Sequence, residues 1–319
     1  MPVWQIASYE EGWASCRSCP TSRSMVSGSW PWLRIRAWLS CGLPGPLCLR
    51  TVHPGPELLA GLALRDVKRI GKRIVLAFDN DLYAVIHLMI AGRLHWRESG
   101  SAIPRGNGMF SFDFRAGSLM MTEASTKRRA SLHLIAGAVG LLQFERGGID
   151  MMTASSADIA VALRRHNRTL KRALTDPAIV DGIGNAYSDE ILHRARLSPF
   201  ALTGNLTDDA IVQLIEATRA VVREWIDRLR DQAGDGFLAK VTAFRPEMAV
   251  HGKYGEPCPV CGVPVQRIVY AENEANYCPG CQTGGRVLAD RSLSRLLKDD
   301  WPRTVDELEK LHPSPEGGR

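Results

Sequence analysis

Four cysteines near the C-terminal end of the chain have the spacing of a metal site. They form two Cys-x-x-Cys pairs separated by 16 residues, Cys258 with Cys261 and Cys278 with Cys281. Such pairs can hold four thiolates in the tetrahedral arrangement that zinc prefers, and Gly262 and Gly280 would allow tight turns. The alternative, buried free thiols, does not account for this regular spacing. Because four cysteine ligands leave no open position for water, we predict one structural zinc ion that stabilises a hairpin.

A glycine-rich turn is the second candidate for chemistry. Residues 181–190 read DGIGNAYSDE, so that Gly182 and Gly184 come just before Asn185. Two glycines within three residues let the backbone approach a ligand closely, and exposed amides ahead of a helix can bind a phosphate. The turn lacks the third glycine of a dinucleotide fingerprint and follows a helical segment, which excludes that interpretation. Taken alone, such a turn more often reverses the chain than binds a ligand.

Basic residues and histidines offer further candidates. Lys72 lies in the strand-forming segment RIGKRIV, where alternation predicts that Lys72 and Ile74 share one face. A lone lysine in a strand is usually a solvated edge charge. The triplet KRR at residues 127–129 is usually a solvated loop too, although in a basic protein it can clamp phosphates. His87 and His95 flank an apolar stretch, and we expect both to be core histidines with hydrogen-bond partners.

Composition limits the class of protein and of partner. A chain of 319 residues that is 45% hydrophobic can form about two domains with sizeable cores, which excludes disorder throughout. The net charge of +6 and the pI near 9.0 favour a polyanionic partner, with nucleic acid first. Apolar runs such as residues 134–142 are shorter than the ~20 residues of a membrane-spanning helix, and Glu10 and Glu11 interrupt any signal-peptide core. We therefore expect a soluble, intracellular protein.

Periodicity divides the chain into a strand-rich part and a helical part. The predicted strands are short and closely spaced, at residues 67–70, 73–78, 82–89, 93–97, 109–114, 119–122 and 131–135. This pattern is typical of an antiparallel sandwich or barrel. Ser155 and Asp158 resemble a capping box, which predicts a helix over 155–174, and helical spacing predicts a second helix over 211–229. Residues 145–154 are the predicted linker.

Taken together, the motifs resemble the formamidopyrimidine-DNA glycosylase and endonuclease VIII family of base-excision repair enzymes. The resemblance rests on RIGKRIVLAF, HLMIAGRL, DPAIVDGIGNAYSDEILHRARLSPF and VHGKYGEPCPVCG through NYCPGC, and it covers residues 47–300. It implies an α+β fold that begins with an N-terminal antiparallel β-sandwich domain at 47–145. A helix-two-turn-helix domain at 155–250, a four-cysteine zinc finger at 251–290 and a tail at 291–319 would follow.

The resemblance also implies an activity and a partner. Members of the family act on damaged double-stranded DNA as glycosylases with apurinic-site lyase activity. Because a base inside a duplex cannot be attacked, such an enzyme flips the nucleotide out and fills the hole with wedge side chains. We expect oxidised purines such as 8-oxoguanine and formamidopyrimidines as substrates, with oxidised pyrimidines as the alternative. We further expect a cytoplasmic monomer of bacterial type that is associated with the nucleoid through DNA and has no membrane contact.

The DNA contacts can be carried over residue by residue. Lys72 matches a lysine that contacts the backbone beside the lesion, and it is also a candidate catalytic residue, whereas Asn185 matches a phosphate-binding asparagine. The other predicted DNA contacts are Ile90, Arg128, Arg129, Tyr187, Lys253 and Asn273. Three departures leave the lesion preference weakly determined. Ile90 stands where the family has an intercalating methionine, residues 127–130 replace an arginine-phenylalanine pair, and Asn273 replaces the arginine of the finger.

The N-terminal segment, residues 1–46, does not fit this pattern, since it holds five of the eight tryptophans without periodicity. The family's chemistry begins at an N-terminal proline, whose amine attacks the sugar C1′ to form a Schiff base, while a following glutamate serves as acid and base. Here Pro2 is followed by Val3, and the first glutamate is Glu10. Codons that can encode residues 16–25 read, one base earlier, as Met-Pro-Glu-Leu-Pro-Asp-Ile-Glu-Val-Tyr, which is the family's start. We interpret residues 1–46 as an aberrant segment that results from a frameshift between residues 15 and 47, with residues 1–15 as upstream sequence read as protein.

Two alternatives remain open. A genuinely divergent terminus would leave a damaged-DNA-binding protein without catalysis, because Lys72, Asn185 and the cysteines are present while the proline-glutamate pair is not. That alternative predicts an ordered, packed start, whereas the frameshift predicts a poorly packed one. A zinc-ribbon module for transcription or structure would explain the cysteines, but it leaves the GIGN turn and the RIGK strand unaccounted for.

Overall fold

The computed structural model describes residues 48–233, 244–270, 273–288, 302–304 and 307, together with the backbone of 35–37. Pro2 and most of the frameshift interpretation for residues 1–46 therefore lie outside the described residues, as does most of the predicted tail at 291–319. The chain divides into two compact units: the first runs to Arg146 and also includes part of a long helix from Trp225, and the second begins at Gly147. Within the described residues, no helix is long and apolar enough to cross a membrane.

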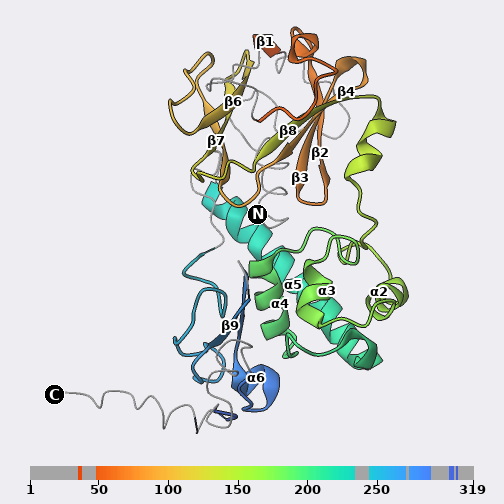
Figure 1. Cartoon of the computed structure of the whole chain (residues 1–319), viewed down its shortest axis with the longest axis vertical. Helices are drawn as coiled ribbons and strands as arrows, with labels where there is room; N and C mark the ends of the chain where they lie inside the picture. Colours follow the sequence, from red (N-terminus) through yellow and green to blue (C-terminus); the bar gives the residue numbers. More distant parts are fainter. Residues whose placement is uncertain are drawn as a thin grey trace, which may run out of the picture. The chain divides into compact units, whose positions relative to one another are not determined.

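The first unit contains two four-stranded antiparallel sheets (Figure 1). One sheet has the order β2 (Leu64–Ile70), β3 (Arg73–Phe78), β4 (Leu82–His87) and β8 (Ser131–Ala136). The other has the order β1 (Ile35–Ala37), β6 (Gly108–Phe114), β7 (Ser118–Glu123) and β5 (Gly92–Arg97). The rings of Phe78 and Phe112, one from each sheet, have their centroids 6.2 Å apart. All seven predicted strands are present, and the predicted β-sandwich is confirmed.

Burial on both faces explains the continuous apolar runs of β3 and β4. On one face Val75 and Val85 pack with Ile135 and Phe144, the last of which belongs to the 3-10 helix η3 (Ala138–Phe144). Ile74 and the other alternate residues of β3 are buried on the opposite face. The unit also contains two further 3-10 turns, η1 (Pro56–Leu59) and η2 (Asp79–Asp81). A sheet covered on both faces needs no polar alternation.

The second unit is helical, but it differs from the prediction at one place. Residues 155–174 do not form one helix: the structure has α2 (Ser156–Arg164) and α3 (Leu170–Thr175). The capping box is confirmed, because the Ser155 hydroxyl accepts a hydrogen bond from the Asp158 amide at 3.1 Å. Thr203 causes the break, since its hydroxyl accepts from the Arg168 amide at 3.1 Å and donates to the carbonyl of residue 166 at 2.7 Å. These tertiary bonds replace intrahelical ones.

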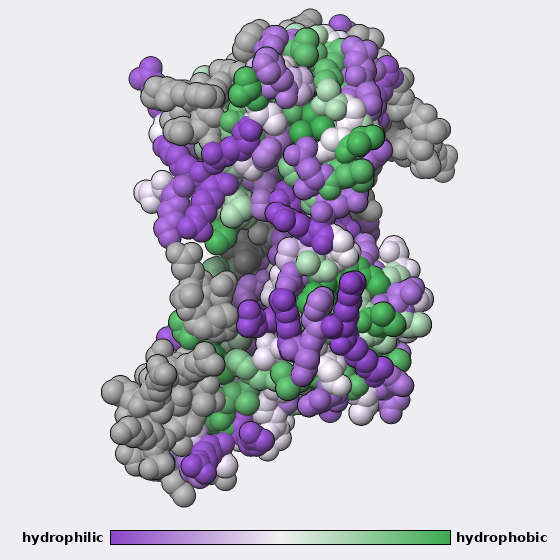
Figure 2. Space-filling view, turned by 45° about the vertical axis from the view of Figure 1, so that its right-hand side comes forward, coloured by the Kyte–Doolittle hydropathy of each residue, from purple (hydrophilic) through white to green (hydrophobic). Residues whose placement is uncertain are grey.

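Three further elements complete the helical part of the unit. They are α4 (Asn185–Arg194), the 3-10 turn η4 (Thr203–Asn205) and α5 (Asp208–Ala233), of which the residues before Trp225 belong to this unit. The long helix predicted over 211–229 is confirmed, and its buried face includes Leu214, Val222 and Leu229. In the view of Figure 2 hydrophilic side chains predominate over the described surface, as expected when such apolar faces point inward.

The region of the cysteines forms a small finger. It consists of an antiparallel hairpin of β9 (Gln266–Tyr270) and β10 (Asn273–Tyr277), followed by the short helix α6 (Pro279–Thr283). Val250 and Val265 are buried together with Cys258 and Cys278. Because so few apolar side chains are enclosed, a metal ion is the expected source of most of the finger's stability.

Candidate functional site

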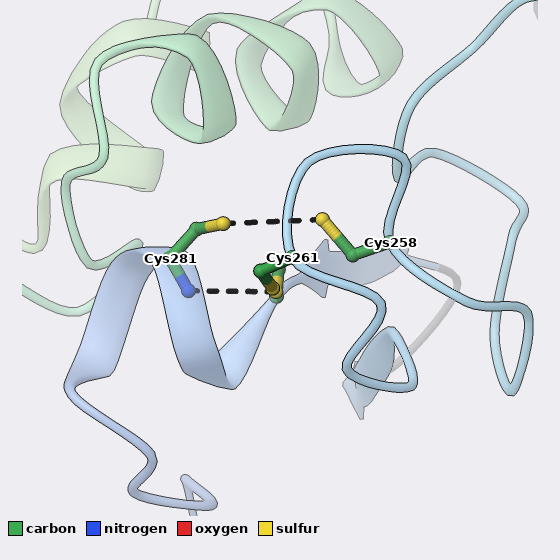
Figure 3. Close-up of side chains that lie close together, drawn as sticks. Cys258, Cys261 and Cys281 are labelled. Carbon is green, nitrogen blue, oxygen red and sulfur yellow. Dashed lines mark hydrogen bonds between the residues drawn. The ribbon is translucent and has the colours of Figure 1, made fainter.

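The four cysteines meet at one point, as the sequence predicts. Their sulfur atoms all lie within 4.8 Å of one another. The Cys258 and Cys281 sulfurs are 3.9 Å apart, and the Cys261 and Cys278 sulfurs are 3.3 Å apart. Figure 3 shows Cys258 and Cys261 on the loop that precedes β9, facing Cys281 on α6. Cys278 is the N-cap of α6, where its sulfur accepts from the Cys281 amide. The predicted ligand set is confirmed.

The chemistry of these thiols fits a structural zinc ion. Burial raises the pKa of Cys278, and it raises the pKa of Cys281 to about 11. Without a cation these thiols would therefore stay protonated. Zinc would supply the positive charge that keeps its thiol ligands deprotonated. Gly262 has a φ of 77° and makes the predicted turn. Gly280 acts differently: a Cβ there would lie 3.1 Å from the Cys261 sulfur, so the glycine leaves room for the ligand.

Lys72 lies in a turn, which corrects the prediction that it shares a strand face with Ile74. Ile70 pairs with Arg73, so Gly71 and Lys72 form a two-residue hairpin loop between β2 and β3. Gly71 has a φ of 59°, and a positive φ at only the first loop position is the pattern of a type II′ turn. The glycine thus closes the hairpin and brings the half-buried Lys72 to its tip.

Ile90 occupies the tip of the connection between β4 and β5. Its side chain is 80% exposed, which is unusual for a residue of this size and hydrophobicity. The turn is closed by a hydrogen bond of 2.9 Å from the Gly92 amide to the Leu88 carbonyl. An apolar side chain held outward on a tight turn has the form that a wedge between base pairs requires.

The basic loop at residues 124–130 is held by a buried carboxylate. Glu123, the last residue of β7, accepts hydrogen bonds from the amides of Arg129 and Ala130 at 3.0 and 3.1 Å. The Arg128 guanidinium donates to the Gly106 carbonyl at 2.6 Å. The loop also contacts the turn of Ile90, because the amide of residue 124 donates to the carbonyl of residue 91 at 3.4 Å. Two of the predicted DNA contacts are therefore fixed in a defined loop.

These residues lie at one end of the sandwich. Arg73 begins β3 and pairs with His87, which ends β4 and pairs with Ser131, the first residue of β8. The connections that contain Lys72, Ile90, Arg128 and Arg129 consequently leave the same end of the sheet. We call these four residues the sandwich-end group. The register of the strands thus brings together residues that are up to 57 positions apart in the sequence.

Asn185 begins helix α4, after the glycine turn. The N-cap residue is Gly184, which provides no side-chain cap, and Gly182 has a φ of 83°. The carbonyl of Asn185 accepts hydrogen bonds from the Lys171 ammonium at 2.9 Å and from the Ser188 hydroxyl at 2.8 Å. The asparagine side chain is partly exposed at the positive end of the helix dipole. This arrangement suits an anion such as a phosphate.

A buried polar network supports this helix. Lys171 on α3 donates to the Asp189 carboxylate at 2.5 Å, and their side chains are 3% and 0% exposed. The other Asp189 oxygen contacts the His251 Nδ1 atom at 2.8 Å and the Asn276 amide nitrogen at 3.4 Å. Burial lowers the pKa of Lys171, an effect that Asp189 opposes. The network joins α3, α4 and the finger around the first turn that holds Asn185.

A second carboxylate of α4 fixes the chain that leads into the finger. Glu190 accepts hydrogen bonds from the amides of Ala249, Val250 and His251, at 2.8 to 2.9 Å. Burial raises the pKa of Glu190, whereas these three amides lower it. Three donors on one carboxylate compensate for its removal from water.

The sequence did not identify the residues of this network. A signal was present, because Asn185, Asp189 and His193 recur at intervals of four along α4 and so share one face of the helix. Polar residues on a helix face are usually solvated, however, and only the tertiary structure shows that the finger covers this one.

The remaining predicted contacts have mixed outcomes. The side chain of Tyr187, another predicted DNA contact, is 1% exposed and belongs to the core of this structure. Lys253 is partly exposed and forms an ion pair of 3.0 Å with Glu256 on the finger. Asn273 begins β10, with its backbone paired to Tyr270, and its side chain lies outside the described part of the structure.

The two histidines are half-buried and do not belong to the buried core, which corrects the prediction of core histidines. The His95 Nε2 atom is 2.8 Å from the Thr122 hydroxyl. Burial, together with the charges of Arg73 and Lys72, lowers the pKa of His87 to about 4. A neutral His87 beside these cations adds no further positive charge at the sandwich end.

Three family models match the chain along its length. The formamidopyrimidine-DNA glycosylase N-terminal domain matches residues 49–130, and the formamidopyrimidine-DNA glycosylase H2TH domain matches residues 150–234. The zinc finger found in FPG and IleRS matches residues 255–284. These ranges correspond to the sandwich, the helical region and the finger.

Relatives and solved structures agree with these matches. The formamidopyrimidine-DNA glycosylase of Thermus thermophilus is 30% identical over 76% of this chain and 92% of its own length. An uncharacterized formamidopyrimidine-DNA glycosylase-like protein of Mycobacterium tuberculosis is 43% identical over 47% of this chain and 94% of its own.

A mutant of the Lactococcus lactis FPG, solved in complex with Fapy-dG containing DNA, shares the fold. Its TM-score is 0.70 at 20% identity, and the match covers 89% of this chain and all of that one. By its motifs, its metal ligands, its fold and these relatives, the chain belongs to the formamidopyrimidine-DNA glycosylase family.

Proposed function

We propose that the protein is a DNA glycosylase with apurinic-site lyase activity, which excises oxidised purines from damaged duplex DNA in base-excision repair. The observation that carries the proposal is the sandwich-end group, where one exposed apolar residue stands among cationic ones. Ile90 is 80% exposed, and the same end of the sheet carries Lys72 and the loop of Arg128 and Arg129. The relatives named above and the DNA complexes of the structural neighbours support this assignment.

Each part of the group has a role in this proposal. The cationic side chains contact phosphates and so position the duplex. Ile90 enters the stack where the damaged nucleotide is flipped out, and it fills part of the space that the nucleotide leaves. In the second unit Asn185 and the N-terminus of α4 bind a phosphate. We also propose that the protein acts as a monomer on DNA in the cytoplasm, which sedimentation of the protein with and without duplex tests.

Catalysis depends on the start of the chain. The N-terminal family model matches only from residue 49, which supports a disturbed reading frame before that point. With the frame restored, a proline amine would attack the sugar C1′, and the following glutamate would transfer protons. A second candidate function, damaged-DNA binding without catalysis, is favoured by one observation, namely that Val3 follows Pro2 where the family has glutamate.

An excision assay separates the two candidates. Two versions are compared on a duplex with one 8-oxoguanine. One is the chain of the present sequence, and the other is a frame-restored version that begins at the Met-Pro-Glu start and continues in the corrected frame to residue 47. We expect the frame-restored version to release the base and nick the strand, and the present chain to bind the duplex without nicking it. An undamaged duplex of the same sequence is the control. Failure of both versions to cut, with lesion binding retained, would leave the binding function as the better account.

A further inference from the structure

His193 lies against the metal centre but belongs to a different part of the fold. It is in the last turn of α4 and is 6% exposed. Its Nε2 atom is 3.2 Å from the sulfur of Cys258, a residue 65 positions further along the chain. Both side chains are buried, which limits competition from water for this contact.

The histidine stands outside the set of metal ligands. The sulfur atoms of the four cysteines lie within 4.8 Å of one another. Among the described residues, the cluster of possible metal ligands at this distance consists of these four cysteines and does not include His193. Four thiolates already fill the tetrahedral coordination of zinc. The histidine ring is therefore placed to bond a ligand and not the ion.

The other hydrogen bonds to these sulfurs, among the described residues, come from within the finger. The Val260 amide donates to Cys258 at 3.5 Å, and the Cys281 amide donates to Cys278 at 3.5 Å. The contact of His193 differs in two respects: it is shorter, at 3.2 Å, and its nitrogen atom comes from helix α4. It therefore links the metal centre to the helix that begins with Asn185.

We propose that His193 is a positioning residue of the zinc centre, whose Nε2–H donates a hydrogen bond to the metal-bound thiolate of Cys258. Zinc with four thiolates carries a net charge of −2, and a buried donor stabilises part of that charge. A neutral ring suffices, because the tautomer with its proton on Nε2 supplies the donor. Partners of this kind typically change metal affinity about 10–100-fold when they are removed.

The proposal predicts a specific defect in metal binding. His193→Phe retains a ring of similar size but loses the donor, whereas His193→Gln retains an N–H group. We expect the Phe variant to release zinc to a competing chelator about tenfold faster or more, and the Gln variant to recover part of the loss. His95→Phe is the matched control, since it removes one histidine hydrogen bond, to Thr122, in the sandwich.

Cobalt(II) substituted for zinc gives a second readout that a merely structural role would not change. Loss of a hydrogen bond to a thiolate alters the electron density on sulfur, so the sulfur-to-cobalt charge-transfer band should shift in His193→Phe and remain in place in His95→Phe. Full-length protein is used, and neither measurement needs DNA or catalysis. If the Phe variant does not fold, His193→Leu takes its place. A zinc-release rate within about twofold of the parent, together with an unshifted band, would overturn the proposal.

Discussion

Replacing Lys171 by methionine tests whether the buried network holds the helix of Asn185. The substitution keeps an unbranched side chain of nearly the same length but removes the charge that faces Asp189 at 2.5 Å. Removing one partner of a buried ion pair typically costs about 3–5 kcal/mol, because the other charge is left uncompensated. Asp189 retains His251 at 2.8 Å, and the Asn185 carbonyl retains the Ser188 hydroxyl at 2.8 Å. We therefore expect the lower end of that range, about 3 kcal/mol.

Urea unfolding followed by far-ultraviolet circular dichroism measures this loss. The signal reports mainly on the second unit, because α2, α3 and α4 belong to it. With a slope of about 1–3 kcal/mol per molar urea, a loss of about 3 kcal/mol lowers the midpoint by at least about 1 M. Such a loss is a large part of the roughly 5–15 kcal/mol that stabilises a typical domain.

The matched control is Lys253→Met, which breaks an exposed ion pair with Glu256 in the same unit. Exposed pairs contribute about 0–1 kcal/mol, so its midpoint should hardly change. Equal, small shifts for Lys171→Met and Lys253→Met would refute the idea that the Lys171–Asp189 pair supports the fold. If Lys171→Met lowers the free energy of unfolding strongly, and adding Asp189→Asn to it lowers that free energy no further, the two residues act as a pair.

The remaining predictions address the metal, the wedge, the phosphate contact and pH. Full chelation of zinc should disorder the finger and weaken binding to a lesion duplex, and an unchanged affinity in a titration would count against this. Ile90→Ala should leave the melting temperature unchanged, because the side chain is 80% exposed, but should lower excision; equal excision rates would argue against a wedge. Asn185→Ala should weaken binding to damaged and undamaged duplexes alike, as measured by fluorescence anisotropy, whereas a loss confined to the lesion duplex would contradict a phosphate contact. Burial lowers the pKa of His87 from 6.5 to about 4, so the unfolded chain binds more protons between these values. Stability should therefore fall as pH decreases through that window, and a His87→Gln variant with the same urea-midpoint profile would contradict the assignment.

Local signals predicted the strands, the long helix and the metal ligands. The apolar runs of β3 and β4 and the spacing of the four cysteines depend only on neighbouring residues, so they can be read from the sequence. The positions of Lys72 and Tyr187 could not be predicted from the sequence in this way. A two-residue hairpin places Lys72 in a turn, and the packing of α4 turns Tyr187 into the core.

Long-range hydrogen bonds account for the other failures. The hydroxyl of Thr203 interrupts the predicted helix over 155–174 from 35 positions away, and no local pattern marks that residue as a helix breaker. In the sequence, Lys171 and Asp189 look like ordinary charged residues on a helix. Their burial depends on the finger, which follows them in the chain. The predicted roles of Ile90, Asn185 and Lys253 in DNA binding stay predictions until variants are measured.

Borohydride trapping on a lesion duplex tests the proposed catalysis most directly. Reduction of the Schiff base leaves a covalent link between the protein and the DNA only if an amine of the protein has attacked the sugar. We expect the frame-restored version to form this adduct on an 8-oxoguanine duplex, and a variant with glycine in place of its second-position proline to form much less. No adduct from the frame-restored version, while it still binds the duplex, would contradict the glycosylase and lyase assignment.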